Sequence, residues 1–496
     1  MIFISFIFLF LFLIPHLQGS QTYTNLTVNT LSQSEGVKFE NFKSSDQFAF
    51  SVSSAGDFNN DGYNDIVIGS NGANTTIGIV YVIFGTKDGP TDLTISSGLT
   101  PNQSLIIFGP ETSTQLGSAV SYAGDVNDDG IDDIVISGYG YRTKGIVYVI
   151  YGSKNLPKVI NLKDGLNTTQ GFTILGVNAQ DLLGVSVSGI GDFNEDGIDD
   201  FAIGAVGFAN KKGAVYVIFG KKGTRSNITL ASGLSSTEGF GIYGASNGDY
   251  IGYSMSKCGD LNGDGIDDLL FSAVGVNNWA GALVVIFGNK TDTFSYLDLS
   301  KGLSPKQGFI VTANLTPDYF GISVAGVGDF NGDGRNDIIV GAHVQNTYRG
   351  AVYVIFGREG ISNMSLTSGF DLTKGFKIQG ANPIDVLGYF TAGAGDYNGD
   401  GLKDILVGAN QANGMTGVAY VIFGSKEPAQ NINLADGLSP ERGFTIKSTY
   451  TYDALGAGLA NAGDMNQDGM DDLLLAAYHG SSRPGAAYLF YTPRNK

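Results

Sequence analysis

The chain has 496 residues, including 73 Gly and one Cys, and carries a formal net charge of −18. Only 15% of the residues are charged while 42% are hydrophobic, which argues against a disordered polyanion. The acidic balance argues against a nucleic-acid partner, because phosphate contacts need clustered Lys and Arg. A single Cys excludes an intramolecular disulfide framework, and the length alone suggests about three domains of roughly 150 residues each.

The N-terminus carries an apolar run at residues 2–14, followed by Pro15 and Gly19. A run of ~13 residues is short for an uncleaved anchor, which needs about 20, and is typical of a secretory signal peptide. The positive charge that usually precedes such a run is missing, so the cleavage position stays open. We expect residues 1–19 to be removed. Residues 20–496 would then form a single domain without a membrane span, secreted or held at the cell surface through a partner.

Eight Asn-x-Ser/Thr sequons support a secretory route, because N-linked glycans are added to surface loops of secreted proteins. A chain rich in Asn and Thr produces single sequons by chance, so the set carries more weight than any one member. The expected glycosylation sites are Asn25, Asn74, Asn102, Asn167, Asn227, Asn289, Asn314 and Asn363.

An internal repeat dominates the remaining sequence. One nine-residue string, which reads DFNEDGIDD at 192–200, occurs seven times, and successive copies begin 67 to 69 residues apart. The copies occupy residues 57–65, 125–133, 192–200, 260–268, 329–337, 396–404 and 464–472. Because the period is even, we expect a single array of seven units rather than the three domains that the length suggests.

Each unit has the same order of predicted strands. In the third unit an alternating run at 185–190 precedes the acidic string, and apolar runs at 201–203 and 214–219 follow it. A polar connection then leads to a fourth run at 239–243. Four short strands with Gly at the turns predict a four-stranded antiparallel blade, and seven blades predict a β-propeller. We name the strands A, B, C and D in chain order, so that the acidic string joins A to B.

The chain ends predict how the ring closes. The sequence finishes with a C strand at 486–491, whereas residues 36–39 match the D strand at 239–242. We therefore expect an all-β, seven-bladed propeller in which the N-terminal strand joins the last blade. This arrangement favours a closed ring over an open solenoid.

The A–B string gathers oxygen atoms, with Asp at positions 1, 5 and 9 and Asn at position 3. Oxygen ligands in a flexible loop favour Ca²⁺ over octahedral Mg²⁺. Position 6 is always Gly, which permits a sharp turn, and position 7 varies freely, as a backbone carbonyl ligand would allow. We predict up to seven bound Ca²⁺, one per blade.

The expected ligands are Asp57, Asn59, Asp61, Tyr63 and Asp65; Asp125, Asn127, Asp129, Ile131 and Asp133; Asp192, Asn194, Asp196, Ile198 and Asp200; Asp260, Asn262, Asp264, Ile266 and Asp268; Asp329, Asn331, Asp333, Arg335 and Asp337; Asp396, Asn398, Asp400, Leu402 and Asp404; and Asp464, Asn466, Asp468, Met470 and Asp472. The simpler alternative is that these turns only cap hairpins, since Asp, Asn and Gly favour turns. Seven copies that all keep three Asp argue against it, because three carboxylates in one turn repel one another without a cation. An EF-hand is excluded because position 12 is never Glu and strands flank the string.

Residues 320–329 read FGISVAGVGD and residues 338–342 read IIVGA, and both resemble the FG-GAP repeat of integrin α-subunit propellers. Related repeats occur in glycosylphosphatidylinositol-specific phospholipase D and in microbial surface proteins. The resemblance implies a calcium-binding propeller with an adhesive or interaction role toward an extracellular protein or glycan. The sequence departs from the integrin pattern because the Pro of GAP is missing from every copy, and because all seven units carry the acidic string.

The two ends of the blades differ in their expected use. Six sequons fall in C–D connections, at the end that carries the acidic strings, so the B–C and D–A end is freer and is the face that integrin propellers use. Aromatic and Arg residues are typical interface anchors, although each could equally serve turn packing between blades. The expected partner residues are Tyr139, Tyr141, Arg142, Phe208, Trp279, Tyr348, Arg349 and Tyr450.

The alternatives are a propeller enzyme acting on glycans or lipids and a structural module of an extracellular coat. His343 and His479 lie in B–C turns without an evident nucleophile partner. Cys258 aligns with apolar positions of the other units, so a buried, unreactive thiol is expected. No polar cluster is unique to one unit, and we therefore expect no catalytic residues.

Overall fold

The computed structural model describes residues 25–41, 44–90, 93–94, 100, 102–290, 296–313, 317–366, 370–478 and 485–493. The predicted signal peptide, Asn314 and His479 lie outside these described residues.

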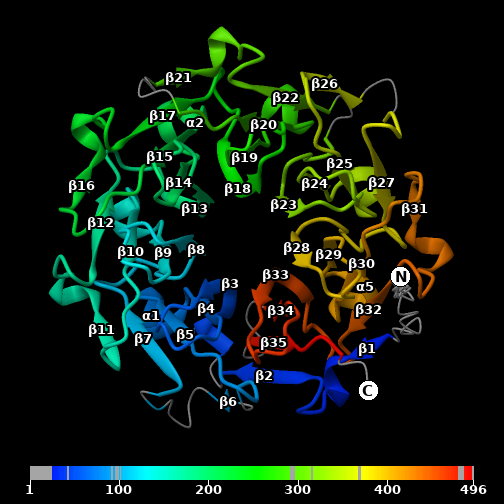
Figure 1. Ribbon diagram of the computed structural model, residues 1–496, viewed down its shortest axis with the longest axis horizontal. Coiled ribbons are helices and arrows are strands. Elements are labelled where there is room, and N and C mark those ends of the chain that lie inside the picture. The colour runs from blue at the N-terminus through cyan, green and yellow to red at the C-terminus, as the bar shows by residue number, and fades with distance from the viewer. Residues whose placement is uncertain are drawn as a thin grey trace, which may run out of the picture.

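Within the described residues, the strands form seven five-stranded sheets arranged as blades around a central axis (Figure 1). Strands A to D of blades 1 to 3 are β3 (Phe48–Gly56), β4 (Asp65–Ser70), β5 (Ile79–Ile83) and β7 (Ser104–Phe108); β8 (Val120–Gly124), β9 (Asp133–Gly138), β10 (Ile146–Ile150) and β12 (Gly171–Leu175); and β13 (Leu183–Gly191), β14 (Asp200–Ala205), β15 (Ala214–Ile218) and β17 (Gly239–Tyr243). Those of blades 4 and 5 are β18 (Ile251–Gly259), β19 (Asp268–Ala273), β20 (Ala282–Ile286) and β22 (Gly308–Thr312); and β23 (Val324–Gly328), β24 (Asp337–Ala342), β25 (Ala351–Ile355) and β27 (Gly375–Gln379). Those of blades 6 and 7 are β28 (Thr391–Gly395), β29 (Asp404–Ala409), β30 (Val418–Ile422) and β32 (Gly443–Lys447); and β33 (Leu455–Gly463), β34 (Asp472–Ala477), β35 (Ala486–Phe490) and β2 (Gly36–Glu40). The predicted seven-bladed propeller of antiparallel A–D strands is confirmed.

Each blade also has a fifth strand, which the sequence analysis did not predict. This strand lies in the C–D connection of the following blade and pairs in parallel with the D strand. The fifth strands of blades 1 to 7 are β11 (Val159–Asn161), β16 (Ile228–Thr229), β21 (Leu297–Asp298), β26 (Met364–Ser365), β31 (Ile432–Asn433), β1 (Leu26–Thr27) and β6 (Leu93–Thr94). Every C–D connection therefore links two neighbouring blades.

The N-terminal segment closes the ring at two sheets. Its strand β2 pairs antiparallel with β35, so that Phe39 lies opposite Ala487 in blade 7. The preceding strand β1 pairs in parallel with β32, the D strand of blade 6. Figure 1 places this blue segment beside the red C-terminal strand. The predicted closure by the N-terminal strand is confirmed, and β1 extends it to the neighbouring blade.

The apolar core lies between adjacent blades. Strands such as β5 and β15 are buried along their whole length because sheets cover both of their faces. One cluster joins Val80 and Val82 of blade 1 to Ile134 and Tyr148 of blade 2. Strands covered on both sides read as continuous apolar runs rather than alternating ones, which explains sequences such as IVYVI.

Glycine pairs set the closest approach between blades. A Cβ added to Gly341 on strand B of blade 5 would lie 1.8 Å from the carbonyl oxygen of Gly388, which begins blade 6. Gly204 and Gly252 stand in the same relation between blades 3 and 4. The first glycine of each pair belongs to a Gly-Ala segment such as 341–342, and the second belongs to the segment that corresponds to FG, such as 387–388. The glycines of the repeat motif are therefore the residues at which neighbouring blades contact each other.

The B–C connections contain short turns rather than regular helices. Their central residues adopt left-handed backbone angles, for example Asn277 at φ 53°. These turns are α1 (Ala73–Thr76), α2 (Phe208–Lys211), α3 (Val276–Trp279), α4 (Gln345–Tyr348) and α5 (Ala412–Met415). Short 3₁₀ turns follow five of the fifth strands, namely η1 (Val28–Thr30), η5 (Leu162–Asp164), η6 (Leu230–Ser232), η7 (Leu299–Lys301) and η9 (Leu434–Asp436), while η2 (Ser44–Asp46) precedes β3 and η4 (Tyr141–Thr143) lies between β9 and β10.

Candidate functional site

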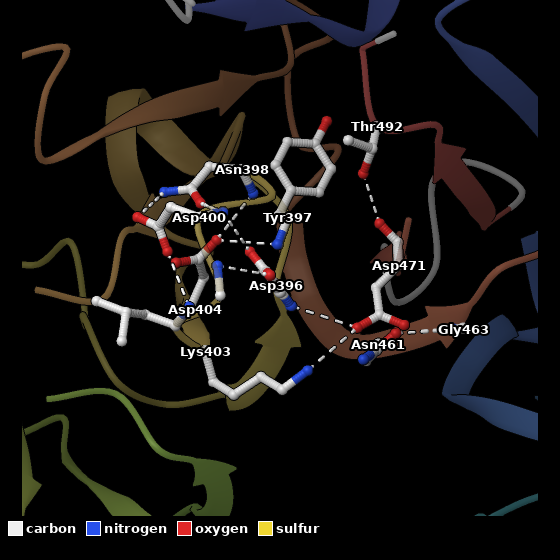
Figure 2. A network of polar contacts seen from close by, with 12 residues as sticks. Asp396, Tyr397, Asn398, Asp400, Lys403, Asp404, Asn461, Gly463, Asp471 and Thr492 are labelled. Carbon is white, nitrogen blue, oxygen red and sulfur yellow. Dashed lines mark hydrogen bonds and ion pairs between the residues drawn. The ribbon is translucent and has the colours of Figure 1, made fainter. Parts of the chain in front are cut away.

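Each acidic string forms the A–B connection of its blade, and its last Asp begins strand B. In the loop at 396–404, drawn in Figure 2, Asp396 accepts the backbone N–H of Asp400 at Oδ1 (3.0 Å) and that of Gly401 at Oδ2 (2.9 Å). Gly401 has φ +88°, a left-handed angle that favours Gly. The position-1 carboxylate thus folds the loop back over itself, as in the other loops.

The aspartate at position 9 is buried beneath the loop. Asp404 has no exposed surface, and its Oδ2 accepts the N–H of Tyr397 (3.0 Å) while Oδ1 accepts that of Gly424 (2.9 Å). It therefore joins the acidic loop to the residue that follows strand C. Burial raises the pKa of Asp404 to about 8, and the nearby carboxylates of Asp400 and Asp396 add to that rise.

The same arrangement recurs in the other six blades. The backbone donors are Asn59 and Gly85 for Asp65, Val126 and Gly152 for Asp133, Phe193 and Gly220 for Asp200, Leu261 and Gly288 for Asp268, Phe330 and Gly357 for Asp337, and Met465 and Thr492 for Asp472. All six carboxylates are fully buried, and burial raises the pKa of each.

The donor set of the loop fits a hard cation, although the described residues contain no preformed cluster of three or more His, Cys, Asp or Glu groups that could hold a metal ion. The Asp side chains at positions 1, 5 and 9 offer carboxylate oxygens as ligands. The Asn at position 3 offers its amide oxygen if Oδ1, rather than Nδ2, faces the ion. Here Asn398 Nδ2 donates to Asp400 Oδ2 (3.0 Å), and the same contact occurs in four other loops. Carboxylates close enough to raise one another's pKa are a setting in which a bound cation relieves repulsion.

Position 8 has a role that the sequence analysis missed. Asp132 Oδ2 accepts the N–H of Asp57 (2.7 Å), so a residue of loop 2 holds the first residue of loop 1. Asp199 holds Asp125 in the same way (3.0 Å). In Figure 2, Asp471 accepts the N–H of Asp396 (3.3 Å). Several strings end in two consecutive Asp residues, at positions 8 and 9. Only the second of these is the buried Asp of position 9, so the presence of the first could have indicated a separate role.

The opposite end of the blades carries a row of contacting rings. Trp279 in α3 lies between Tyr250 and Tyr319, with ring centroids 5.1 Å away on each side. The row continues from Tyr319 to His343 (5.4 Å) and from His343 to Tyr389 (4.7 Å). Sequence reasoning found Trp279 but missed these tyrosines, although Tyr250 and Tyr319 directly precede the Gly-containing FG elements of their blades.

The remaining predicted partner residues do not form one cluster. Phe208 stacks on Tyr243 (5.3 Å), and Arg142 pairs with Glu111 (3.0 Å) while its guanidinium lies over Tyr141. These contacts match the packing role that the sequence analysis kept as an alternative. Tyr348 and Tyr450 are exposed, whereas Tyr139 and Arg349 are partly buried.

Three sequon asparagines connect neighbouring blades. Asn227 Oδ1 accepts the N–H of Thr173 (2.9 Å), Asn363 Oδ1 accepts that of Ile310 (2.7 Å), and Asn25 Oδ1 accepts that of Thr445 (2.9 Å). Each asparagine directly precedes a fifth strand and bonds to the D strand of the preceding blade. All seven sequon asparagines within the described residues are exposed: Asn25, Asn74, Asn102, Asn167, Asn227, Asn289 and Asn363.

Two of the groups considered for catalysis, Cys258 and His343, are buried. Cys258 lies in the core, where burial raises its thiol pKa and its Sγ contacts the carbonyl oxygen of Asp268 at 3.1 Å. Burial lowers the pKa of His343 to about 4. Helices within the described residues are all too short to cross a membrane.

The fold and these loops define a seven-bladed β-propeller with an acidic A–B loop in every blade. A model of the FG-GAP repeat matches residues 48–83, 183–218, 320–355 and 388–422, which contain the A, B and C strands of blades 1, 3, 5 and 6. Four segments of the chain therefore match the FG-GAP repeat, and the propeller resembles that of integrin α-subunits.

Relatives of two kinds share this similarity. Integrin alpha-5 of Xenopus laevis is 29% identical over 46% of this chain and 20% of its own length, and integrin alpha-PS2 of Drosophila melanogaster is 30% identical over 47% and 16%. Phosphatidylinositol-glycan-specific phospholipase D of Homo sapiens is 26% identical over 73% of this chain and 43% of its own length. The chain thus spans about a fifth of the integrins and less than half of the phospholipase.

The position-9 contact gives a prediction that does not depend on a cation. Asp404→Asn keeps one carbonyl oxygen but turns an N–H₂ group toward a backbone N–H, so it should lower the free energy of unfolding by about 1–3 kcal/mol. Urea denaturation in chelator measures this, with the exposed Asp164→Asn as the matched control. Equal stability of the two variants would contradict a structural role for the buried carboxylate.

Proposed function

We propose that the protein is an extracellular, calcium-loaded propeller that binds other proteins or glycans in adhesion. The acidic loop present in every blade carries this proposal, together with the similarity to integrin α-subunits. Asp, Asn and Asp at positions 1, 3 and 5, the carbonyl at position 7 and Asp at position 9 would hold one Ca²⁺ per loop. The ion would supply fixed positive charge that neutralises the carboxylates and orders the loop.

The charge distribution supports a cation in each loop. The seven strings hold 27 of the 47 acidic residues of the chain. Seven Ca²⁺ would reduce the formal charge from −18 to about −4. Concentrating so much like charge at one end of the ring opposes folding unless it is neutralised.

Calcium should stabilise the fold by mass action. A site that binds only the folded state contributes about 2.7 kcal/mol when free calcium exceeds the dissociation constant 100-fold. We expect calorimetry to show a lower melting temperature in chelator than in calcium, with magnesium restoring less of the loss. Asp400→Asn should remove one bound ion in a calorimetric titration, whereas Asp164→Asn should remove none. Identical melting curves with and without chelator would refute the assignment.

The aromatic row around Trp279 is the best candidate for the partner surface. Trp279 and Tyr348 are 36% and 51% exposed although both are large and apolar. They lie on adjacent B–C turns, α3 and α4, at the end of the ring opposite the acidic loops. Trp, Tyr and Arg dominate the binding energy of many protein interfaces, and Arg349 follows directly after α4.

Loss of these side chains should reduce adhesion without unfolding the ring. We expect Trp279→Ala with Arg349→Ala to lower attachment of the source organism's cells to immobilised protein at least tenfold, while the melting temperature changes little. Tyr296→Ala is the matched control, because Tyr296 is 66% exposed but lies in a C–D connection at the other end. Attachment that survives the double substitution would remove this face from the proposal.

Secretion with glycosylation completes the proposed setting. The side-chain Oδ1 atoms of Asn25, Asn227 and Asn363 accept hydrogen bonds from a neighbouring blade, whereas an N-linked glycan attaches at Nδ2. The bond between blades and the glycan are therefore compatible. Asn431 makes the same bond to Lys377 (2.9 Å) outside any sequon, so this position serves the fold with or without sugar.

Two substitutions separate the glycan from the bond between blades. In protein secreted from eukaryotic cells, Thr229→Ala should remove one glycan, seen as a mass loss, and leave the melting temperature almost unchanged. Asn431→Ala should lower the free energy of unfolding by about 1 kcal/mol without altering the glycan mass. A Thr229→Ala protein of unchanged mass would show that Asn227 is not glycosylated.

A further inference from the structure

A cavity of about 80 Å³ lies between blades 5 and 6, beside the C–D connection of blade 6. Its lining includes the rings of Phe330, Phe356, Phe376 and Phe423. Ala429 from the connection also lines it and contributes only a methyl group. The cavity is several times larger than a single water needs, and Ser425, Gln430 and Arg442 add polar groups to its lining.

The chain fills the equivalent position with its own side chains in other blades, among them blades 5 and 3. The position lies three residues before the fifth strand, where blade 6 has Ala429 and blade 5 has Ile361. Ile361 is only 3% exposed and packs in one cluster with Phe287 and Phe309, the counterparts of Phe356 and Phe376. Blade 6 therefore has the walls of this slot without the side chain that occupies it in blade 5.

Blade 3 fills the slot in a different way. Arg225 is 8% exposed, and its guanidinium lies 5.4 Å from the ring centroid of Phe172. Its Nη2 donates to the carbonyl oxygen of Phe219 (2.7 Å), and Glu238 attracts the buried charge. The residue of blade 6 that corresponds to Glu238, directly before strand D, is Arg442.

We propose that the blade 6 slot binds a branched aliphatic side chain of a partner, with a basic residue beside it. An aliphatic group matches the phenyl walls and the way Ile361 fills blade 5. In blade 3, the negative charge of Glu238 attracts the guanidinium of Arg225. In blade 6, Arg442 stands at the position of Glu238, and its positive charge would repel a guanidinium bound in the slot. Two exposed carboxylates, Glu427 and Glu441, line the opening against the single positive charge of Arg442, and this balance favours a basic neighbour outside the slot.

This surface is separate from the aromatic row and does not depend on the adhesion proposal. It lies at the end of the ring that carries the acidic loops, because Phe330 is the second residue of the loop at 329–337. The carbonyl oxygen of Phe330 accepts the N–H of Ser425 (2.9 Å), which fixes the connection of blade 6 against that loop. The slot thus lies where the loop at 329–337 and the connection of blade 6 are joined by a backbone hydrogen bond.

The test uses the full chain with labelled isoleucine methyl groups, because Ile422 and Ile432 line the cavity. The blocked dipeptide Ac-Ile-Lys-NH₂ should shift these two methyl signals in a saturable manner. Ac-Ala-Lys-NH₂ should bind at least tenfold more weakly, because three carbons fewer are buried. Ala429→Ile should abolish the shifts and raise the melting temperature, whereas the exposed Ala435→Ile should do neither.

Each other outcome contradicts part of the proposal. Equal binding of the Ala and Ile peptides would contradict the proposed specificity for an aliphatic side chain. Stronger binding of Ac-Gly-Arg-NH₂ would show that the slot prefers a guanidinium group. Equal binding of Ac-Ile-Glu-NH₂ would remove the basic neighbour. If Ala429→Ile raises the melting temperature but no peptide shifts the wild-type signals, the cavity is only a packing defect and the proposal fails.

Discussion

The buried carboxylate at position 9 is the contact on which each blade depends. A charged carboxylate without water is costly unless hydrogen bonds compensate it, and here two backbone N–H groups from different parts of the blade offset part of that cost. In blade 6 Asp404 joins the acidic loop at Tyr397 to Gly424, the residue after strand C. The protein thereby holds the loop in shape through its own hydrogen bonds. The proposed cation would then bind a loop whose backbone is largely arranged, which would lower the ordering cost of binding.

The ring is held together by a second set of contacts that cross from blade to blade. Glycine pairs such as Gly341 and Gly388 bring the inner strands close, while fifth strands and bonds such as that from Asn227 join the outer ones. Asp132 adds a contact between successive acidic loops. A blade therefore shares its core, its outer edge and its loop with a neighbour. The N-terminal strands β1 and β2 supply these contacts where the repeat would otherwise end.

The features that were predictable are those that recur locally in the sequence. The seven-fold string gave the number of blades, and the match between residues 36–39 and 239–242 gave the closure. The fifth strands were not predictable, because a strand such as β21 has two residues, Leu297 and Asp298, and no alternation to reveal it. Its partner lies in the preceding blade, and local patterns do not encode such long-range parallel pairing.

The residues of the candidate sites also differ in how far the sequence alone could predict them. The loop residues recur in every blade and could be read directly, whereas Tyr250 and Tyr319 each occupy one turn and meet only through Trp279. The position-8 aspartates were hidden by their neighbours, since sequence alone does not tell which of two adjacent acids is buried and which reaches the next loop. Contacts between repeats are a property of the assembled ring.

Repetition also indicates where binding specificity resides. A residue that the fold requires must recur at its position in most blades, as Asp404 and Gly401 do. A residue type found at its position in one blade alone is therefore not required by the repeated fold. Trp279 is the only Trp in the chain, and Ala429 leaves open a slot that Ile361 fills one blade earlier. Because both departures lie on surfaces that the ring presents to solvent, they are the positions at which we propose that this propeller contacts its partners.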